Sequence, residues 1–195
     1  MTVYTTMLYY ILHPQILVFS GNMRKRDWSL IWLLWAVLFG VLYSDHSEAS
    51  ECKFFDKLTP YQIDVAEMSY KAGLPYDLGL TAVAIAWEES RLGLYKVRHN
   101  VNNVKDTSYG VMHTVAFWKV KEMSHFDAGN WVQDMITEDA KSIDVGIQDI
   151  LYWQNAAKGD WLKGVGMYNG GWKPNKDYGQ RIVKTVRELK ECEWL

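Results

Sequence analysis

Two adjacent glutamates, Glu88 and Glu89, are the residues in this sequence whose setting is best suited to chemistry. They end a stretch, 78–93, in which ten small and apolar residues run directly into two carboxylates, a serine and then a glycine. Positions 78, 82, 85, 86 and 89 follow helical spacing, so a buried helix face over 78–90 is expected to carry Glu89 inward at its last turn. A carboxylic acid at the edge of an apolar face is a candidate proton donor. The alternative is a solvated helix end, in which Glu88 pairs with Arg91.

Other catalytic chemistries lack their usual residue patterns. The five histidines, at 13, 46, 99, 113 and 125, show no metal-ligand spacing, so we expect neither a metal nor a cofactor. There is no glycine-rich phosphate loop and no G-x-S-x-G motif, and no histidine lies close to Ser90 in the sequence. A net charge of −2 without a basic stripe argues against nucleic acid as a partner. Carboxylate chemistry remains.

The N-terminal residues predict export. A basic cluster at 24–26 precedes an apolar run over 28–43, and a small-x-small pattern follows at 47–49, which is the order of a secretory signal. The run is shorter than the ~20 residues that a spanning helix prefers, but an uncleaved inner-membrane anchor is the alternative. Met23 is a second candidate start. We therefore expect an N-terminal extension, 1–49, and an exported domain, 50–195, in the periplasm or cell envelope.

Two cysteines bracket the exported part. Cys52 lies near its beginning and Cys192 near its end. In an oxidising compartment they could form a disulfide that ties the first and last elements together. The alternative is two free structural thiols.

The elements that must position the glutamates are mostly helical. Thr59 and Pro60 predict a helix start, and Asp160 predicts another. The expected helices cover 59–72, 78–90, 110–123, 137–157, 161–168 and 176–193. Residues 95–107 are expected to form a loop or a short ribbon, and 126–136 an irregular segment. The prediction is one mainly helical (all-α) domain without internal repeats.

Four stretches, taken in order, resemble the lysozyme-like family of soluble lytic transglycosylases and goose-type lysozymes. Residues 84–90 are similar to Ala-x-Ala-x-x-Glu-Ser, and 108–113 resemble Ser-x-Gly-Leu-Met-Gln. Residues 167–171 resemble Ala-Tyr-Asn-Ala-Gly, and Tyr178 with Ile182 resembles a closing Tyr-x-x-x-Val. The resemblance spans about 58–190.

The resemblance implies a lysozyme-like fold whose cleft binds the glycan strands of peptidoglycan. Glu89 matches the family's catalytic acid/base, which protonates the oxygen between MurNAc and GlcNAc. In transglycosylases the sugar's own C6 hydroxyl then attacks, which gives a 1,6-anhydro product. By the same matching, the substrate-binding residues are Ser108, Met112, His113, Tyr168, Asn169 and Tyr178.

Two departures and two alternatives accompany this interpretation. His113 stands where the family usually has Gln, and Met167 where Ala is usual. Asp106 resembles the goose-type aspartate that positions water, which would make the chain a muramidase, but it also suits a turn. The other function class is a non-catalytic peptidoglycan-binding component of a secretion or phage apparatus. An inhibitor or membrane-tethered adaptor is a weaker alternative, based only on the N-terminal apolar run.

Overall fold

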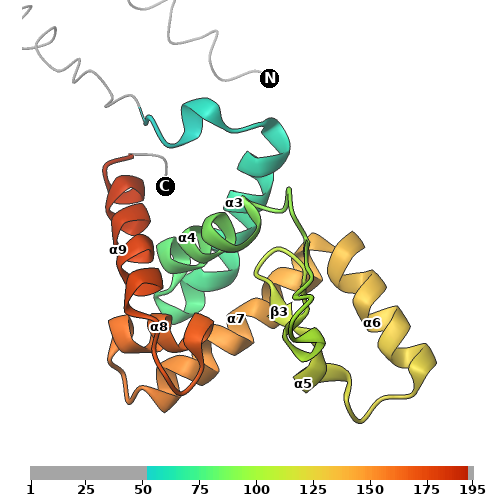
Figure 1. Cartoon of the computed structure of the whole chain (residues 1–195). Coiled ribbons are helices and arrows are strands. Elements are labelled where there is room, and N and C mark those ends of the chain that lie inside the picture. The colour runs from blue at the N-terminus through green and yellow to red at the C-terminus, as the bar shows by residue number, and fades with distance from the viewer. Residues whose placement is uncertain (1–51, 193–195) are drawn as a thin grey trace, which may run out of the picture. The chain divides into compact units, whose positions relative to one another are not determined.

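The computed structural model describes residues 52–192, and this part of the chain is mainly helical. Figure 1 shows α8 and α9 on one side and α6 on the other, with α7 running between them. The α-helices are α3 (Pro60–Gly73), α4 (Gly79–Ser90), α5 (Ala116–Val120), α6 (His125–Thr137), α7 (Asp139–Ala156), α8 (Trp161–Gly170) and α9 (Lys176–Lys190). Three short 3-10 turns accompany them: η1 (Phe55–Lys57), η2 (Leu74–Tyr76) and η3 (Val104–Asp106).

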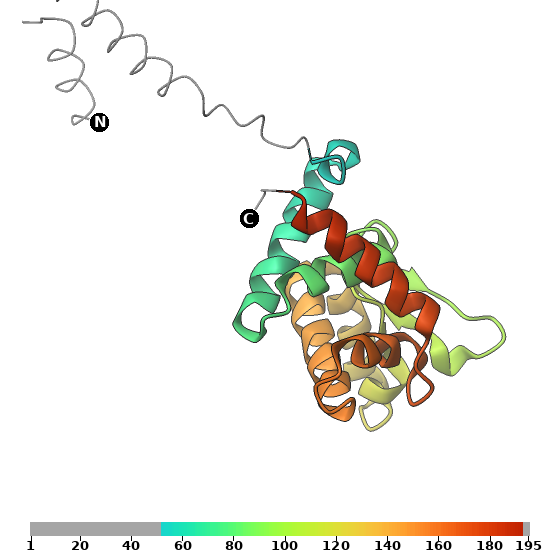
Figure 2. The ribbon, with the colours of Figure 1, turned by 90° about the vertical axis from the view of Figure 1, so that its left-hand side faces the viewer.

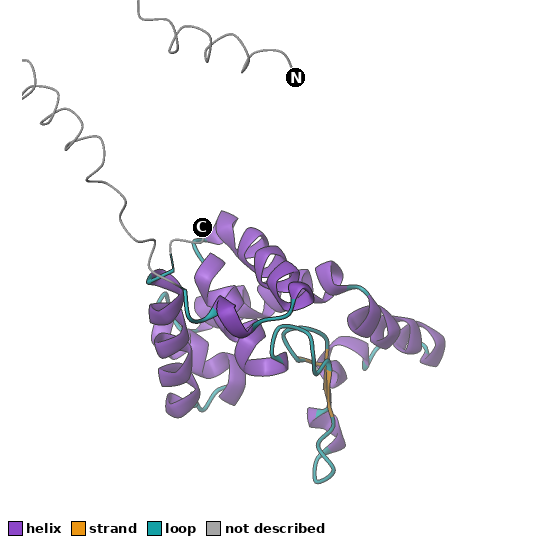
Figure 3. Ribbon diagram, turned by 90° about the horizontal axis from the view of Figure 1, so that it is seen from above, coloured by secondary structure: helices purple, strands orange, loops and turns teal. Residues whose placement is uncertain are grey.

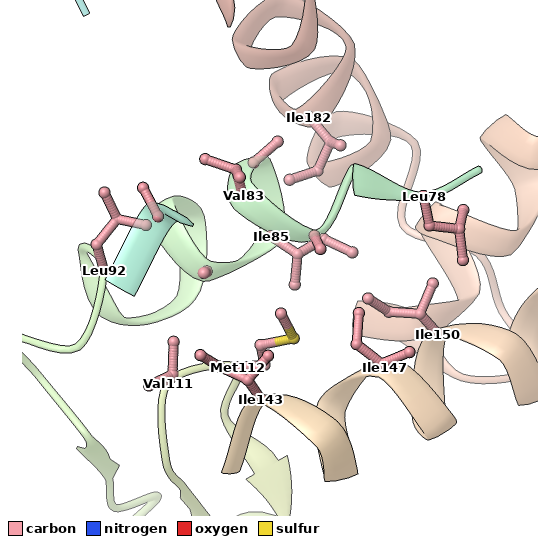
Figure 4. Close-up of a cluster of buried hydrophobic side chains, with 14 of the residues drawn as sticks. Leu78, Val83, Ile85, Leu92, Val111, Met112, Ile143, Ile147, Ile150 and Ile182 are labelled. Atoms are coloured by element: carbon pink, nitrogen blue, oxygen red, sulfur yellow. The ribbon is translucent and has the colours of Figure 1, made fainter. Parts of the chain in front are cut away.

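Helix α4 lies at the centre of this arrangement. It packs against α3 and α9, and every residue from Thr81 to Ala86 is buried. Below it, Met112 lies between Ile85 of α4 and Ile143 of α7 (Figure 4). Each aliphatic side chain buried in such a core contributes about 1.5–3 kcal/mol to folding. The predicted inward face is confirmed: Leu78, Ala82, Ile85 and Ala86 are buried, and the Glu89 side chain is 10% exposed.

The strands form one small antiparallel sheet in the order β1-β2-β3. They are β1 (Val97–Arg98), β2 (Ser108–Tyr109) and β3 (Thr114–Val115), with Val97 opposite Tyr109 and Tyr109 opposite Thr114. Figure 3 shows that the strands occupy one narrow region beside otherwise helical structure. Of the segment 95–107, where a loop or a short ribbon was expected, only β1 is a strand, and its partner β2 follows directly after the segment.

Two helix starts predicted from the sequence, at Thr59 and Asp160, are confirmed. The Thr59 side chain accepts a hydrogen bond from the backbone of Gln62, whose own side chain completes a capping box. Asp160 caps α8, and Asn175 caps α9 by accepting from the Tyr178 backbone N–H. Gly171, with φ of 63°, ends α8 as the Asn-Gly-Gly sequence indicates.

A disulfide joins Cys52 to Cys192, with the two Cα atoms 4.8 Å apart. It connects the segment before α3 to the end of α9, which lie close together in Figure 2. The predicted pairing is thus confirmed, and the alternative of two free thiols is wrong.

Two secondary-structure predictions were wrong. The segment 110–123 is not one helix, because Gly110 and His113 adopt positive φ and residues 114–115 pair with β2 before α5 begins. The segment 126–136 is not irregular, because Ser124 caps α6 and the helix continues to Thr137. Helix α7 then begins at Asp139, after Glu138, so Thr137 ends one helix and does not start the next.

The predicted signal or anchor segment, 1–49, lies outside the described residues. Within residues 52–192, none of the helices has the length and apolar character needed to cross a membrane.

Candidate active site

Glu89 lies in the last turn of α4, and only a small fraction of its side chain is exposed. Its neighbour Ser90 is fully buried and ends the helix by joining it to two later segments. The Ser90 hydroxyl donates to the carbonyl of Val111 at 2.6 Å and accepts from the backbone N–H of Gly93 at 2.7 Å. Ser90 is therefore a structural residue that fixes the end of α4 against the 110–113 turn.

The chain leaves α4 in an unusual conformation. Arg91, Leu92 and Gly93 all have positive φ, at 53°, 54° and 83°. Side chains other than Gly adopt this region at an energetic cost, so surrounding contacts must hold it. Leu92 is fully buried and its N–H bonds to the carbonyl of Ala86. This reversal brings Tyr95 back toward α4.

His113 bridges Glu89 and the returning chain. Its Nδ1 lies 3.2 Å from Oε2 of Glu89, and its Nε2 lies 2.6 Å from the backbone carbonyl oxygen of Tyr95. The His113 side chain is 6% exposed. The position at which the resemblance predicts a sugar contact therefore holds a histidine that contacts the glutamate itself.

The 110–113 turn that carries His113 is fixed by side chains from three helices. The Val111 carbonyl accepts a hydrogen bond from the Ser90 hydroxyl, and the Val111 N–H donates one to the Ser142 hydroxyl at 2.8 Å. The Tyr168 hydroxyl donates to the carbonyl of Met112 at 2.6 Å. Gly146 leaves room for Met112, because a Cβ there would lie 2.5 Å from the sulfur.

Two tyrosines from α8 and α9 face the same carboxylate. Burial, followed by the negative charge of Glu89, raises the pKa of both Tyr168 and Tyr178 well above the usual range. The Tyr178 hydroxyl is buried beside Glu89, yet it completes no hydrogen bond of normal geometry within residues 52–192. A neutral, unpartnered hydroxyl beside a carboxylate is a donor available to a ligand or to Glu89 itself.

Glu88 has a different environment. Its carboxylate accepts a hydrogen bond from Nε of Arg181 on α9, whose guanidinium also lies over the Tyr178 ring. The alternative in which Glu88 pairs with Arg91 is wrong, because Glu88 pairs with Arg181 and Arg91 lies over the Trp87 ring at 4.6 Å. Of the two adjacent glutamates, Glu88 therefore forms an ion pair, and Glu89 lies in the candidate site.

Asp106 is held within its own loop. Oδ1 of Asp106 is 3.2 Å from Nη2 of Arg98, and its Oδ2 accepts from the Asn100 side chain at 3.0 Å. The Ser108 hydroxyl is fully buried and accepts from Nε of Arg98 at 3.1 Å. Both predicted residues therefore contact Arg98, and the turn role weighed for Asp106 fits these contacts.

Met112 and Asn169, two more of the predicted substrate-binding residues, lie in different environments. The Met112 side chain is fully buried in the core, so it lines no open surface, and only its backbone carbonyl takes part in the site. Asn169 is exposed near the end of α8, and its side chain accepts from Asn175 at 2.8 Å. The sequence prediction for Met112 was wrong because an apolar residue in a turn can fill either a core or a cleft.

Comparisons with protein-family models, with curated proteins and with solved structures found no match. The assignment of function must therefore come from the geometry of Glu89, His113 and Tyr178.

Sequence analysis missed three contributors to the site. The Tyr95 carbonyl acts through its backbone, which no side-chain pattern reveals. Lys96 fixes that segment by donating to the carbonyl of Ile136 at 3.0 Å and by pairing with Asp139 at 2.5 Å. Arg181 lies 93 residues from Glu88, so only the packing of α9 on α4 brings them together.

A surface hollow of about 530 Å³ lies elsewhere, between α3, α4, α8 and α9. Its walls include Tyr70, Leu80, Trp161 and Arg187 and none of the predicted site residues. It is therefore distinct from the surface at Glu89.

Proposed function

We propose that this chain is a peptidoglycan lytic transglycosylase that cleaves the bond between MurNAc and GlcNAc, with Glu89 as its acid and base. One observation carries the proposal: a largely buried glutamate ends α4 between a histidine and a buried tyrosine hydroxyl that has no other partner among the described residues. Perturbed and unpartnered polar groups of this kind gather at functional sites.

The reaction needs one carboxyl group in two roles. Protonated Glu89 gives its proton to the glycosidic oxygen as the C1–O4 bond breaks, and the departing GlcNAc keeps that oxygen as a hydroxyl. The C6 hydroxyl of MurNAc then forms the O6–C1 bond and returns its proton to the Glu89 carboxylate. The 1,6-anhydro product and a regenerated acid result, and no water is consumed.

The neutral hydroxyl of Tyr178 supports this cycle. Because burial and the Glu89 charge raise its pKa, Tyr178 keeps its proton through the neutral range and can donate to the carboxylate after the first proton transfer. A donor that strengthens as negative charge develops lowers the barrier more than it stabilises the bound substrate.

The contacts of Asp106 favour the transglycosylase over a muramidase. A water-positioning base must leave a carboxylate oxygen for water, at about 6.5–9.5 Å from the acid. Both oxygens of Asp106 accept a hydrogen bond from Arg98 or Asn100, which orients the carboxylate within the loop before β2. Intramolecular attack needs no second carboxylate, so the contacts present are sufficient for it.

The compartment follows the same proposal. A disulfide between Cys52 and Cys192 is compatible with an oxidising compartment, and peptidoglycan lies in the cell envelope. We therefore propose an exported protein whose partners are glycan strands, with residues 28–43 as its signal or anchor. A role in wall turnover, secretion or phage entry would use the same reaction.

Glu89→Gln against Glu88→Gln tests the assignment. The amide is nearly isosteric with the carboxylic acid but cannot donate a catalytic proton, so Glu89→Gln is expected to lose clearing in a peptidoglycan zymogram, a fall of at least about 10²-fold. Glu88→Gln removes only the partially exposed pair with Arg181 and should keep most activity. Equal clearing by both variants, with unchanged thermal unfolding, would reject Glu89 as the acid.

A further inference from the structure

We propose that His113 is the positioning residue of Glu89 and that the two side chains hold a single proton between them. The contact geometry stands by itself, while its catalytic consequence rests on the function proposed above. His113 would thereby fix the orientation of the carboxyl group that delivers the proton in the proposed reaction.

The Tyr95 carbonyl determines the tautomer of His113. A carbonyl oxygen only accepts hydrogen bonds, so Nε2, which lies 2.6 Å from it, must carry a hydrogen. In the neutral imidazole the other nitrogen, Nδ1, then has a lone pair and no hydrogen. That lone pair points at Oε2 of Glu89 across 3.2 Å.

A hydrogen bond across this contact needs one proton, which has two locations. On Glu89, it makes a carboxylic acid that donates to neutral His113. On His113, it makes an imidazolium that donates to the carboxylate. The two forms differ only in the position of one hydrogen, and the first is the acid that the reaction requires. Without that proton, lone pairs on both atoms face each other in a largely buried site, which is unfavourable.

Other charged groups near the pair are already compensated. Glu88 on α4 pairs with Arg181 of α9, and Asp149 of α7 pairs with Lys119 at 2.6 Å. From α8 and α9, Tyr168 and Tyr178 face Glu89 as neutral phenols because burial raises the pKa of each. Beside Tyr95, Lys96 pairs with Asp139 at the start of α7. His113 is therefore the group that contacts Glu89 and can exchange a proton with it.

The backbone at His113 also indicates a specific role. Its φ is 51°, a conformation that a residue with a bulky side chain adopts only at an energetic cost. Two hydrogen bonds hold the turn in place: the Val111 N–H donates to the Ser142 hydroxyl, and the Tyr168 hydroxyl donates to the Met112 carbonyl. Asparagine adopts positive φ more readily than histidine, so it is a suitable replacement that cannot titrate.

The first test does not depend on activity. In protein with ¹⁵N-labelled histidine and ¹³C-labelled glutamate, spectra recorded between about pH 5 and 9 report which ring nitrogen is protonated. We expect Nε2 to stay protonated throughout, and the Nδ1 and Glu89 carboxyl resonances to change together as one proton leaves. An Nδ1–H tautomer, or two unrelated titrations, would overturn the proposal even in an inactive protein.

The second test is the pH profile of the reaction. In His113→Asn the amide N–H donates to the Glu89 carboxylate at every pH, which favours the unprotonated form. The alkaline limb of kcat/KM is therefore expected to move to lower pH. His113→Gln, also unable to titrate, should shift it in the same direction if the Asn variant folds poorly.

A matched control is His125→Asn, because His125 is exposed at the start of α6. It should leave the profile unchanged. An alkaline limb that is the same in His113→Asn as in the original protein would overturn the positioning role. Failure of every protein to cleave peptidoglycan would instead reject the proposed function, and the resonance experiment would still decide the proton-sharing proposal.

Discussion

Glu89 is enclosed by two kinds of structure, and they are built differently. On the helical side, α8 and α9 present Tyr168 and Tyr178, whose raised pKa values keep them neutral. On the loop side, the segment 91–113 presents His113 and the Tyr95 carbonyl. The helical side therefore supplies one free donor, the Tyr178 hydroxyl, because the Tyr168 hydroxyl already donates to the Met112 carbonyl. The loop side supplies the imidazole that contacts Glu89.

The sources of rigidity differ as well. The helical side is held by side-chain packing around α4 and by the disulfide near the end of α9. The loop side contains three non-glycine residues with positive φ, Arg91, Leu92 and His113. It depends on single hydrogen bonds that its backbone makes with the hydroxyls of Ser90, Ser142 and Tyr168. Changes to the first side should mainly affect stability, and changes to the second should mainly affect the site.

The largest effect is expected on the helical side. Replacing both Cys52 and Cys192 by Ala releases a cross-link between residues 140 apart, which is worth up to about 5 kcal/mol of unfolding free energy in the chain-entropy model. Urea unfolding should shift to lower concentration by the corresponding amount. Peptidoglycan cleavage at low temperature should persist, since the link lies outside the site. An unchanged urea midpoint would contradict the view that the helical side, through this disulfide, mainly determines stability.

Ser90→Ala should break the connection between the two sides. The Gly93 N–H and Val111 carbonyl would lose a buried partner, at a cost of about 2–4 kcal/mol in total. Ser69→Ala is the matched control, because Ser69 is also fully buried but its hydroxyl has no partner within residues 52–192. Thermal unfolding should separate the two variants, and equal melting temperatures would show that Ser90 does not couple helix and turn.

Tyr178→Phe should reduce activity without reducing stability. The variant loses a donor that faces the Glu89 carboxylate, which corresponds to about a 10–100-fold fall in kcat/KM, while no hydrogen bond of normal geometry within residues 52–192 is broken. Tyr76→Phe, at a half-exposed site, is the activity control. If the variant lost stability at neutral pH but kept full activity, the Tyr178 hydroxyl would be a structural group and not a donor in the reaction.

The same variant has a predicted pH signature. Because the folded state raises the pKa of Tyr178, the folded protein keeps a proton that the unfolded chain releases above about pH 10. The associated stability is complete below that pH and falls as pH rises further. Tyr178→Phe should therefore lose less stability than the original protein between neutral and strongly alkaline pH, as measured by urea unfolding.

The sequence was a better guide to the helical side than to the loop side. Periodicity placed Glu89 on the buried face of α4, and Thr59, Asp160 and Asn-Gly-Gly marked helix ends, because these are local properties. The contact between His113 and Glu89 was not predicted, since it arises from consecutive left-handed residues after α4 and a backbone carbonyl acceptor. Arg181 was missed, and Met112 was wrongly placed at the substrate, for a related reason: the partners of both residues depend on how distant helices pack.

The smallest effect is expected at Asp106, at the far end of the loop side. Asp106→Asn keeps an oxygen acceptor for Arg98 or Asn100 and weakens only a partly exposed ion pair, so stability should change by less than about 1 kcal/mol. If Asp106 serves the turn, activity should stay within about a few-fold of the original, since the proposed reaction uses no second carboxylate.

Mass spectrometry of digested sacculi tests the central proposal most directly, since its products distinguish attack by the C6 hydroxyl from attack by water. We expect the original protein and Asp106→Asn to release muropeptides lighter by one water, and Glu89→Gln to release none. Products with a reducing-end MurNAc, lost in Asp106→Asn, would contradict the transglycosylase proposal and identify a hydrolase with Asp106 as its second carboxylate.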